Sequence, residues 1–142
     1  MKQRAVLTVL WLGAFLVCIG LVELYLSRRD AAGLLALLPE DRVPALKPLA
    51  SLYGAYLAGI LAFWFTKPFK APRKDARRRF QFALALACTL IFNGIVVYLV
   101  ARGHLWREGN VIDDILTATK LAALLSFIVG PVNLYYFGAT RT

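Results

Sequence analysis

Several polar residues that could bind an ion or a small charged group lie within long apolar stretches of this chain. An ionisable side chain inside a lipid bilayer is costly, so it is by default a candidate for ion, proton or anion binding. Lys120 and Glu23 are such residues, and Asn93 reaches a similar depth if successive stretches cross in opposite directions. Asp113 and Thr117 share a helical face with Lys120. The predicted polar cluster, open to the exterior, comprises Glu23, Asn93, Asp113, Thr117 and Lys120.

Two structural interpretations of the same residues stay open. The cluster can form an ion pair or a hydrogen-bond network that only fixes helix register. Alternatively, the flexible side chain of Lys120 can extend so that its ammonium group reaches exterior water. Asp113 and Asp114 begin the last apolar stretch, where acidic side chains offset the positive end of a helix dipole. These two acids therefore suit helix capping as well as ligand binding.

The sequence lacks catalytic and metal-binding patterns. His104 is the single histidine, whereas a metal site needs several His, Cys or carboxylate ligands at defined spacings. Cys18 and Cys88 lie inside apolar stretches without a C-x-x-C pattern, which favours packing over redox chemistry. No Ser or Cys has a nearby activating base, and no glycine-rich phosphate loop is present. We therefore predict no enzyme activity, no cofactor and no metal.

Four apolar stretches must position these residues, and they take up most of the 142 residues. They cover residues 5–26, 49–66, 80–101 and 115–137. Crossing ~30 Å of hydrocarbon takes roughly 20 helical residues, and a helix satisfies its own backbone in lipid. With 60% hydrophobic residues, the sequence predicts an all-α, polytopic membrane protein. We expect an antiparallel bundle of four transmembrane helices in a single domain, residues 1–142.

The connection after the first stretch carries a weaker helical signal. Residues 31–38 form an apolar run too short to cross a membrane, and Pro39 ends it. We expect a short interfacial helix there, at the exterior face. Beyond it, Pro44 and Pro48 predict a stiff, extended segment that leads into the second spanning helix.

The formal net charge of +9 is concentrated between the second and third stretches. The basic residues of that loop are Lys67, Lys70, Arg73, Lys74, Arg77, Arg78 and Arg79. Basic loops mark the cytoplasmic side of a membrane protein, so this loop and both termini are predicted to be cytoplasmic, in a plasma membrane of the bacterial inner-membrane type. The loop is expected to attract anionic lipids, at about 1 kcal/mol per cation, or an acidic partner, and no nucleic-acid binding is expected.

Small residues recur every four positions on two of the stretches. One ribbon comprises Gly54, Ala58 and Ala62, and the other comprises Ala118, Ala122, Ser126 and Gly130. Such ribbons let helices approach closely, so that dispersion replaces the hydrophobic drive that lipid removes. The contacts can lie within one chain or between chains, and the sequence does not decide between them. Pro131, which follows the second ribbon, is expected to bend or loosen the last helix.

The leading functional hypothesis is a small non-enzymatic integral membrane protein that acts as a subunit or scaffold. It would associate with itself, as a homo-oligomer, or with a partner membrane protein through the small-residue ribbons. The alternative is a small transporter or ion channel built around Glu23, Asn93 and Lys120. No stretch of the chain reproduces the characteristic residues of a four-helix membrane family, so no family is assigned from the sequence.

Overall fold

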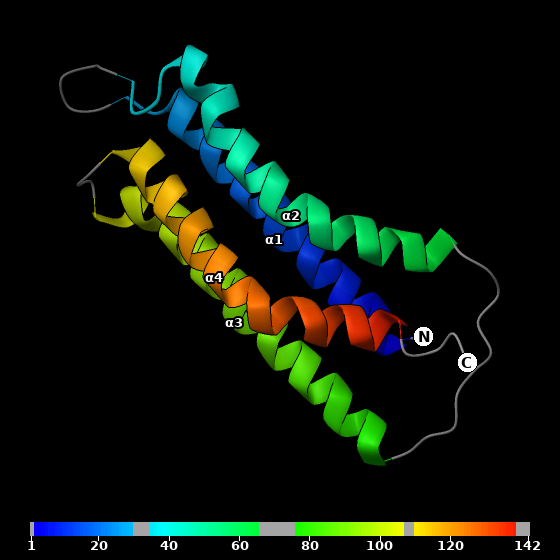
Figure 1. Ribbon diagram of the computed structural model, residues 1–142. Coiled ribbons are helices and arrows are strands. Elements are labelled where there is room, and N and C mark those ends of the chain that lie inside the picture. Colours follow the sequence, from blue (N-terminus) through cyan, green and yellow to red (C-terminus); the bar gives the residue numbers. More distant parts are fainter. Residues whose placement is uncertain (1, 30–34, 66–75, 107–109, 139–142) are drawn as a thin grey trace.

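The computed structural model of the chain is a bundle of four long helices (Figure 1). It describes residues 2–29, 35–65, 76–106 and 110–138. The helices are α1 (Lys2–Ser27), α2 (Arg42–Phe65), α3 (Ala76–Trp106) and α4 (Val111–Gly138), and a short 3-10 helix, η1 (Pro39–Asp41), precedes α2. The all-helical bundle predicted from the apolar stretches is confirmed.

The four helices are arranged in a ring whose order differs from the order of the chain. The main contacts join α1 to α2 and α3, and join α4 to α2 and α3. Successive helices run in opposite directions (Figure 1), so α1 packs parallel to α3, and α2 packs parallel to α4. Each helix therefore has one antiparallel and one parallel neighbour.

All four helices are long and apolar enough to cross a membrane, as judged by their length and composition. Large apolar side chains cover the outside of the bundle, among them Val9, Leu124 and Phe127, which are 67%, 67% and 81% exposed. Contiguous apolar surfaces of this extent are rare on soluble monomers. The outside of the bundle is thus suited to an apolar surrounding.

Two prolines lie inside helices, Pro48 in α2 and Pro131 in α4. A proline lacks the amide donor that would pair with the carbonyl four residues earlier, and it kinks the helix. In Figure 1, α4 changes direction in its orange part. The prediction of an extended segment around Pro44 and Pro48 was wrong, because α2 already begins at Arg42. Pro44 fits the first turn of that helix, where amide groups have no helical acceptor.

Other helix ends also differ from the sequence-based boundaries. The helix α3 begins at Ala76 and ends at Trp106, so it includes residues 76–79 of the predicted basic loop and His104 of the predicted exterior loop. Of the interfacial helix expected over residues 31–38, the described part, residues 35–38, is not helical. Leu35 instead forms an isolated β-bridge with Arg29. Residues 31–34 lie outside the described part of the chain.

The start of α4 is capped by its own sequence. The Asn110 side-chain Oδ1 accepts a hydrogen bond of 3.0 Å from the Ile112 amide, which satisfies one of the free donors at a helix N-terminus. Asp113 and Asp114 lie in the first turn, where their negative charge complements the helix dipole. Their position matches the capping interpretation of these two acids.

Arg4 joins three helices at the end of the bundle that carries both termini (Figure 1). Its Nη2 donates a hydrogen bond of 2.9 Å to the carbonyl oxygen of Tyr136. Its guanidinium carbon lies 4.4 Å from the centre of the Phe63 ring. Tyr136 lies in the last turn of α4, whose carbonyls have no helical partner and carry the negative end of the helix dipole. The buried cation therefore fastens the first turn of α1 to the last turns of α2 and α4.

We predict that Arg4→Leu lowers the free energy of unfolding by about 2 kcal/mol, because a hydrogen bond to a charged group contributes about 1.5–3 kcal/mol. Unfolding in mixed micelles, followed by circular dichroism, measures the change. Lys2→Leu, at an exposed position of the same turn, is the matched control and should shift stability by less than about 0.5 kcal/mol. Equal stability of the two variants would contradict the role given to Arg4.

Candidate functional site

Buried polar side chains gather in one half of the bundle. Among the described residues they are Arg4, Thr89, Asn93 and Asn133. Arg4 and Asn133 belong to the helix ends near the termini, and Thr89 and Asn93 lie near the middle of α3. We call these four residues the polar row, because they follow one another from the terminal end of the bundle to its centre.

Three of these residues are linked by hydrogen bonds between α3 and α4. The Thr89 hydroxyl donates to Asn133 Oδ1 over 3.2 Å, and Asn133 Nδ2 donates to the Val129 carbonyl over 3.0 Å. Asn93 Nδ2 donates to the Thr89 carbonyl over 2.9 Å. The Thr89–Asn133 hydrogen bond is the interhelical contact. Each asparagine side chain is held by a hydrogen bond from its amide group to a backbone carbonyl of its own helix.

Aromatic rings from α1, α2 and α3 pack around the inner end of the polar row. The Trp11 indole stacks on the Tyr56 ring with centroids 4.3 Å apart, and its centroid lies 5.2 Å from that of Phe92. The Tyr56 hydroxyl would lie 3.8 Å from a Cβ added at Gly130 of α4. All four helices therefore contribute to this layer, which we call the central layer.

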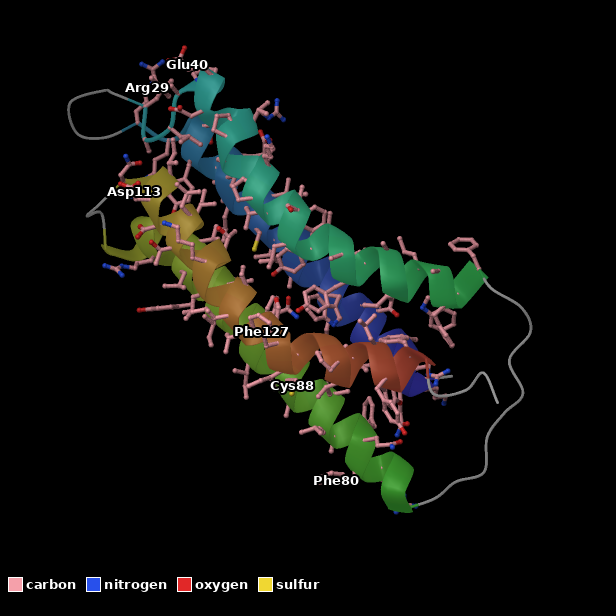
Figure 2. The ribbon with its side chains drawn as sticks, viewed as in Figure 1. Arg29, Glu40, Phe80, Cys88, Asp113 and Phe127 are labelled. Atoms are coloured by element: carbon pink, nitrogen blue, oxygen red, sulfur yellow. The ribbon has the colours of Figure 1, made fainter. Side chains whose placement is uncertain are left out.

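The structure separates the residues of the predicted polar cluster. Asn93 is buried, whereas Asp113, Thr117 and Lys120 are exposed on α4. Figure 2 shows Asp113 at the end of the bundle opposite the termini. An exposed lysine a few turns inside its helix can extend toward the polar boundary. These five residues do not line one common enclosed site.

Glu23 has a partner that the sequence analysis did not name. Arg42 Nη2 lies 2.6 Å from Glu23 Oε1, and Arg42 Nε donates to the same oxygen over 2.9 Å. Both side chains are exposed, at 40% for Glu23 and 56% for Arg42, so the pair contributes little in water, typically 0–1 kcal/mol. Arg42 was assigned to a connection, and only the helical start of α2 brings it beside α1.

The two small-residue ribbons face in different directions. On α4, Ala118, Ala122 and Gly130 are buried and Ser126 is half-buried. On α2, Gly54, Ala58 and Ala62 are exposed. The α4 ribbon therefore packs inside this chain, and the α2 ribbon lies on its outer surface.

Most of the predicted basic surface cannot be placed. Lys67, Lys70, Arg73 and Lys74 lie outside the described residues. Arg77, Arg78 and Arg79 belong to the first turn of α3, and Arg79 is exposed. The start of α3 lies at the same end of the bundle as the start of α1 and the end of α4 (Figure 1).

Sequence reasoning missed Arg4, Trp11 and Thr89 as site residues. Arg4 lies next to an apolar stretch in a chain rich in aromatic residues, and such rings can draw an arginine inward. Trp11 and Thr89 resemble ordinary apolar-helix residues. Their role follows from their position on the inner face of the bundle. In a helix that is apolar on all sides, the sequence pattern does not show which face is the inner one.

The chemistry that this arrangement can perform is hydrogen bonding without charge. Within the central layer the described groups are an indole, hydroxyls and a carboxamide. Comparison with protein-family models, curated proteins and solved structures gives no match for this chain. The function is therefore argued from the geometry.

We predict that Thr89→Val lowers the free energy of unfolding by about 0.6–1.7 kcal/mol, the range for interhelical hydrogen bonds in membrane proteins. In a double-mutant cycle with Asn133→Leu, the two effects should not add, because both variants remove the same bond. Thr119→Val is the control, since that hydroxyl bonds only to its own helix at the Leu116 carbonyl. Additive effects of Thr89→Val and Asn133→Leu would contradict the proposed link.

Proposed function

We propose that this chain is an integral membrane protein that acts as a non-enzymatic subunit or scaffold, and that it associates with a second copy through the outer face of α2. The proposal that the helices span a membrane is supported by the length and composition of all four and by the apolar outside of the bundle. Both termini belong to one end of the bundle (Figure 1), as an even number of crossings requires.

The observation that carries the proposed association is the outer face of α2. Its exposed small residues are Ala50, Ser51, Gly54, Ala55 and Ala58. Among the described residues of α2, no large apolar side chain is exposed between Val43 and Leu61. The other helices do expose such side chains along their middle parts, for example Leu16 on α1, Ile91 on α3 and Leu124 on α4. The middle of α2 is thus the flat part of an otherwise bulky exterior.

A flat helix face allows another helix to approach closely. In lipid, helices associate through dispersion contacts and backbone proximity, and small residues four positions apart favour this approach. A Cβ added at Gly54 would meet nothing within 4 Å, so this face of α2 is open to a neighbour. Two copies inserted in the same direction would place their α2 helices parallel, around a two-fold axis along the membrane normal.

The proposed orientation rests on charge. The end of α2 and the start of α3, which flank the basic residues in the sequence, lie at the same end of the bundle as the start of α1 and the end of α4 (Figure 1). By the positive-inside rule, we propose that this end is cytoplasmic, in a bacterial inner membrane. There the cations would attract anionic headgroups.

The alternative function, a small transporter or channel, gains no support from the positions of its residues. Glu23 pairs with Arg42 at the surface, Lys120 is exposed, and Asn93 is buried. A transport site would need these groups to face one pathway. We therefore develop the scaffold function alone.

We predict that Ala58→Leu weakens self-association at least tenfold, because the added bulk separates the two α2 helices by the width of a side chain. Mass measurement of the intact assembly in mild detergent, over a range of protein concentrations, gives the oligomer size. Ala123→Leu makes the same change at an exposed position of α4 and should leave the oligomer unchanged.

Two outcomes would overturn self-association. One is a wild-type chain that stays monomeric at all concentrations in detergent and in lipid nanodiscs. The other is an Ala58→Leu oligomer as stable as that of Ala123→Leu. If the monomeric wild type instead captures another membrane protein from native membranes, and Ala58→Leu loses it, the occupant of the face is that partner.

A further inference from the structure

Two buried polar atoms in the central layer have no hydrogen-bond partner in the protein. They are the indole Nε1 of Trp11 and the side-chain Oδ1 of Asn93. Trp11 is fully buried and Asn93 is 7% exposed. A buried polar group without a partner costs free energy, and such groups are rare in native proteins. One of these atoms is a donor and the other is an acceptor.

Both atoms belong to one level of the bundle. The Trp11 ring packs against Phe92, and Asn93 follows Phe92 with a rise of about 1.5 Å along the helix. Trp11 also stacks on Tyr56, whose hydroxyl would lie 3.8 Å from a Cβ added at Gly130 of α4. The unpaired donor and the unpaired acceptor thus face the interior from α1 and α3 at similar depth.

The core at this level and toward the termini mixes buried polar side chains with apolar ones such as Leu7 and Ile60. Toward the termini it contains the rest of the polar row, Thr89, Asn133 and Arg4. Toward the opposite end it contains apolar side chains such as Val22, Val100 and Ile115. Because the polar side chains continue to the end of the bundle, a small polar molecule has hydrogen-bonding groups along that half of the core.

We propose that the central layer is an internal hydration site, in which bound water accepts from Trp11 Nε1 and donates to Asn93 Oδ1. Water is the smallest molecule that does both, and buried water is typically held by otherwise unsatisfied polar groups. The described groups of the layer carry no charge, so the site suits a neutral molecule rather than an ion. This inference does not depend on self-association.

Indole nitrogen NMR tests the proposal on the unmodified chain. The protein is labelled with 15N-tryptophan in micelles, and the Trp11 signal is the one that Trp11→Phe removes. Magnetisation transfer from water to the Trp11 Nε1 proton should be seen in the wild type. It should be lost in Asn93→Leu, and it should persist in Asn110→Leu, where the same change is made at the exposed cap of α4.

The outcomes separate a wet site from a dry one. A wild-type Trp11 indole proton without water contact overturns the proposal. Water contact that persists in Asn93→Leu also overturns it.

Discussion

The structure depends on one constraint, which is that large apolar side chains lie on its outer surface as well as in its core. Burial of apolar area therefore cannot decide which side of a helix faces inward, as it does in water. The inward faces are instead marked by directional contacts, each at a junction between helices. The Thr89 hydroxyl joins α3 to α4, and the Tyr25 hydroxyl joins α1 to the Val100 carbonyl of α3 over 2.8 Å. The Trp11–Tyr56 stack joins α1 to α2. These contacts orient the helices, because burial of apolar area does not distinguish one face of a helix from another.

The order of the ring follows from where such contacts lie. The parallel pair α1 and α3 is bonded near the end opposite the termini, through Tyr25, and packed in the middle, through Phe92. Near the termini, Arg4 reaches from α1 to the last turn of α4 instead. A guanidinium group has several donors and a flat face for aromatic rings. It can therefore bind a carbonyl and pack on Phe63 at once, which makes it suited to the point where three helix ends meet.

How much of this could be predicted from the sequence depends on what each feature requires. Length and hydropathy alone predicted the four helices, because backbone satisfaction in lipid leaves few alternatives. The start of α2 was missed because Pro44 indicates an extended segment unless it lies in the first turn of a helix. Whether a helix begins there depends on the residues before Pro44. The cluster around Lys120 was built from depth along each helix. Depth is readable from sequence, but the direction that a side chain faces is not when a helix is apolar all round. Asn93 and Lys120 can share a depth and still face opposite environments.

The two ribbons of small residues also show that the facing direction cannot be read from spacing. The large side chains on the same helix decide which way each ribbon faces. Tyr53, Tyr56 and Leu57 fill the inner face of α2, and a Cβ added at Gly59 would lie 3.2 Å from the Leu134 side chain of α4. The large side chains of α2 thus lie on its inner face. Gly54 and Ala58, which have almost no side chain, lie on its outer face. A helix this asymmetric can bring its backbone close to a neighbour on one side only. The spacing of small residues is the same on α4, but there the opposite face carries Leu124 and Phe127, and the ribbon is used within the chain. The side on which bulk is missing, rather than the spacing itself, determines which ribbon remains available to a second helix.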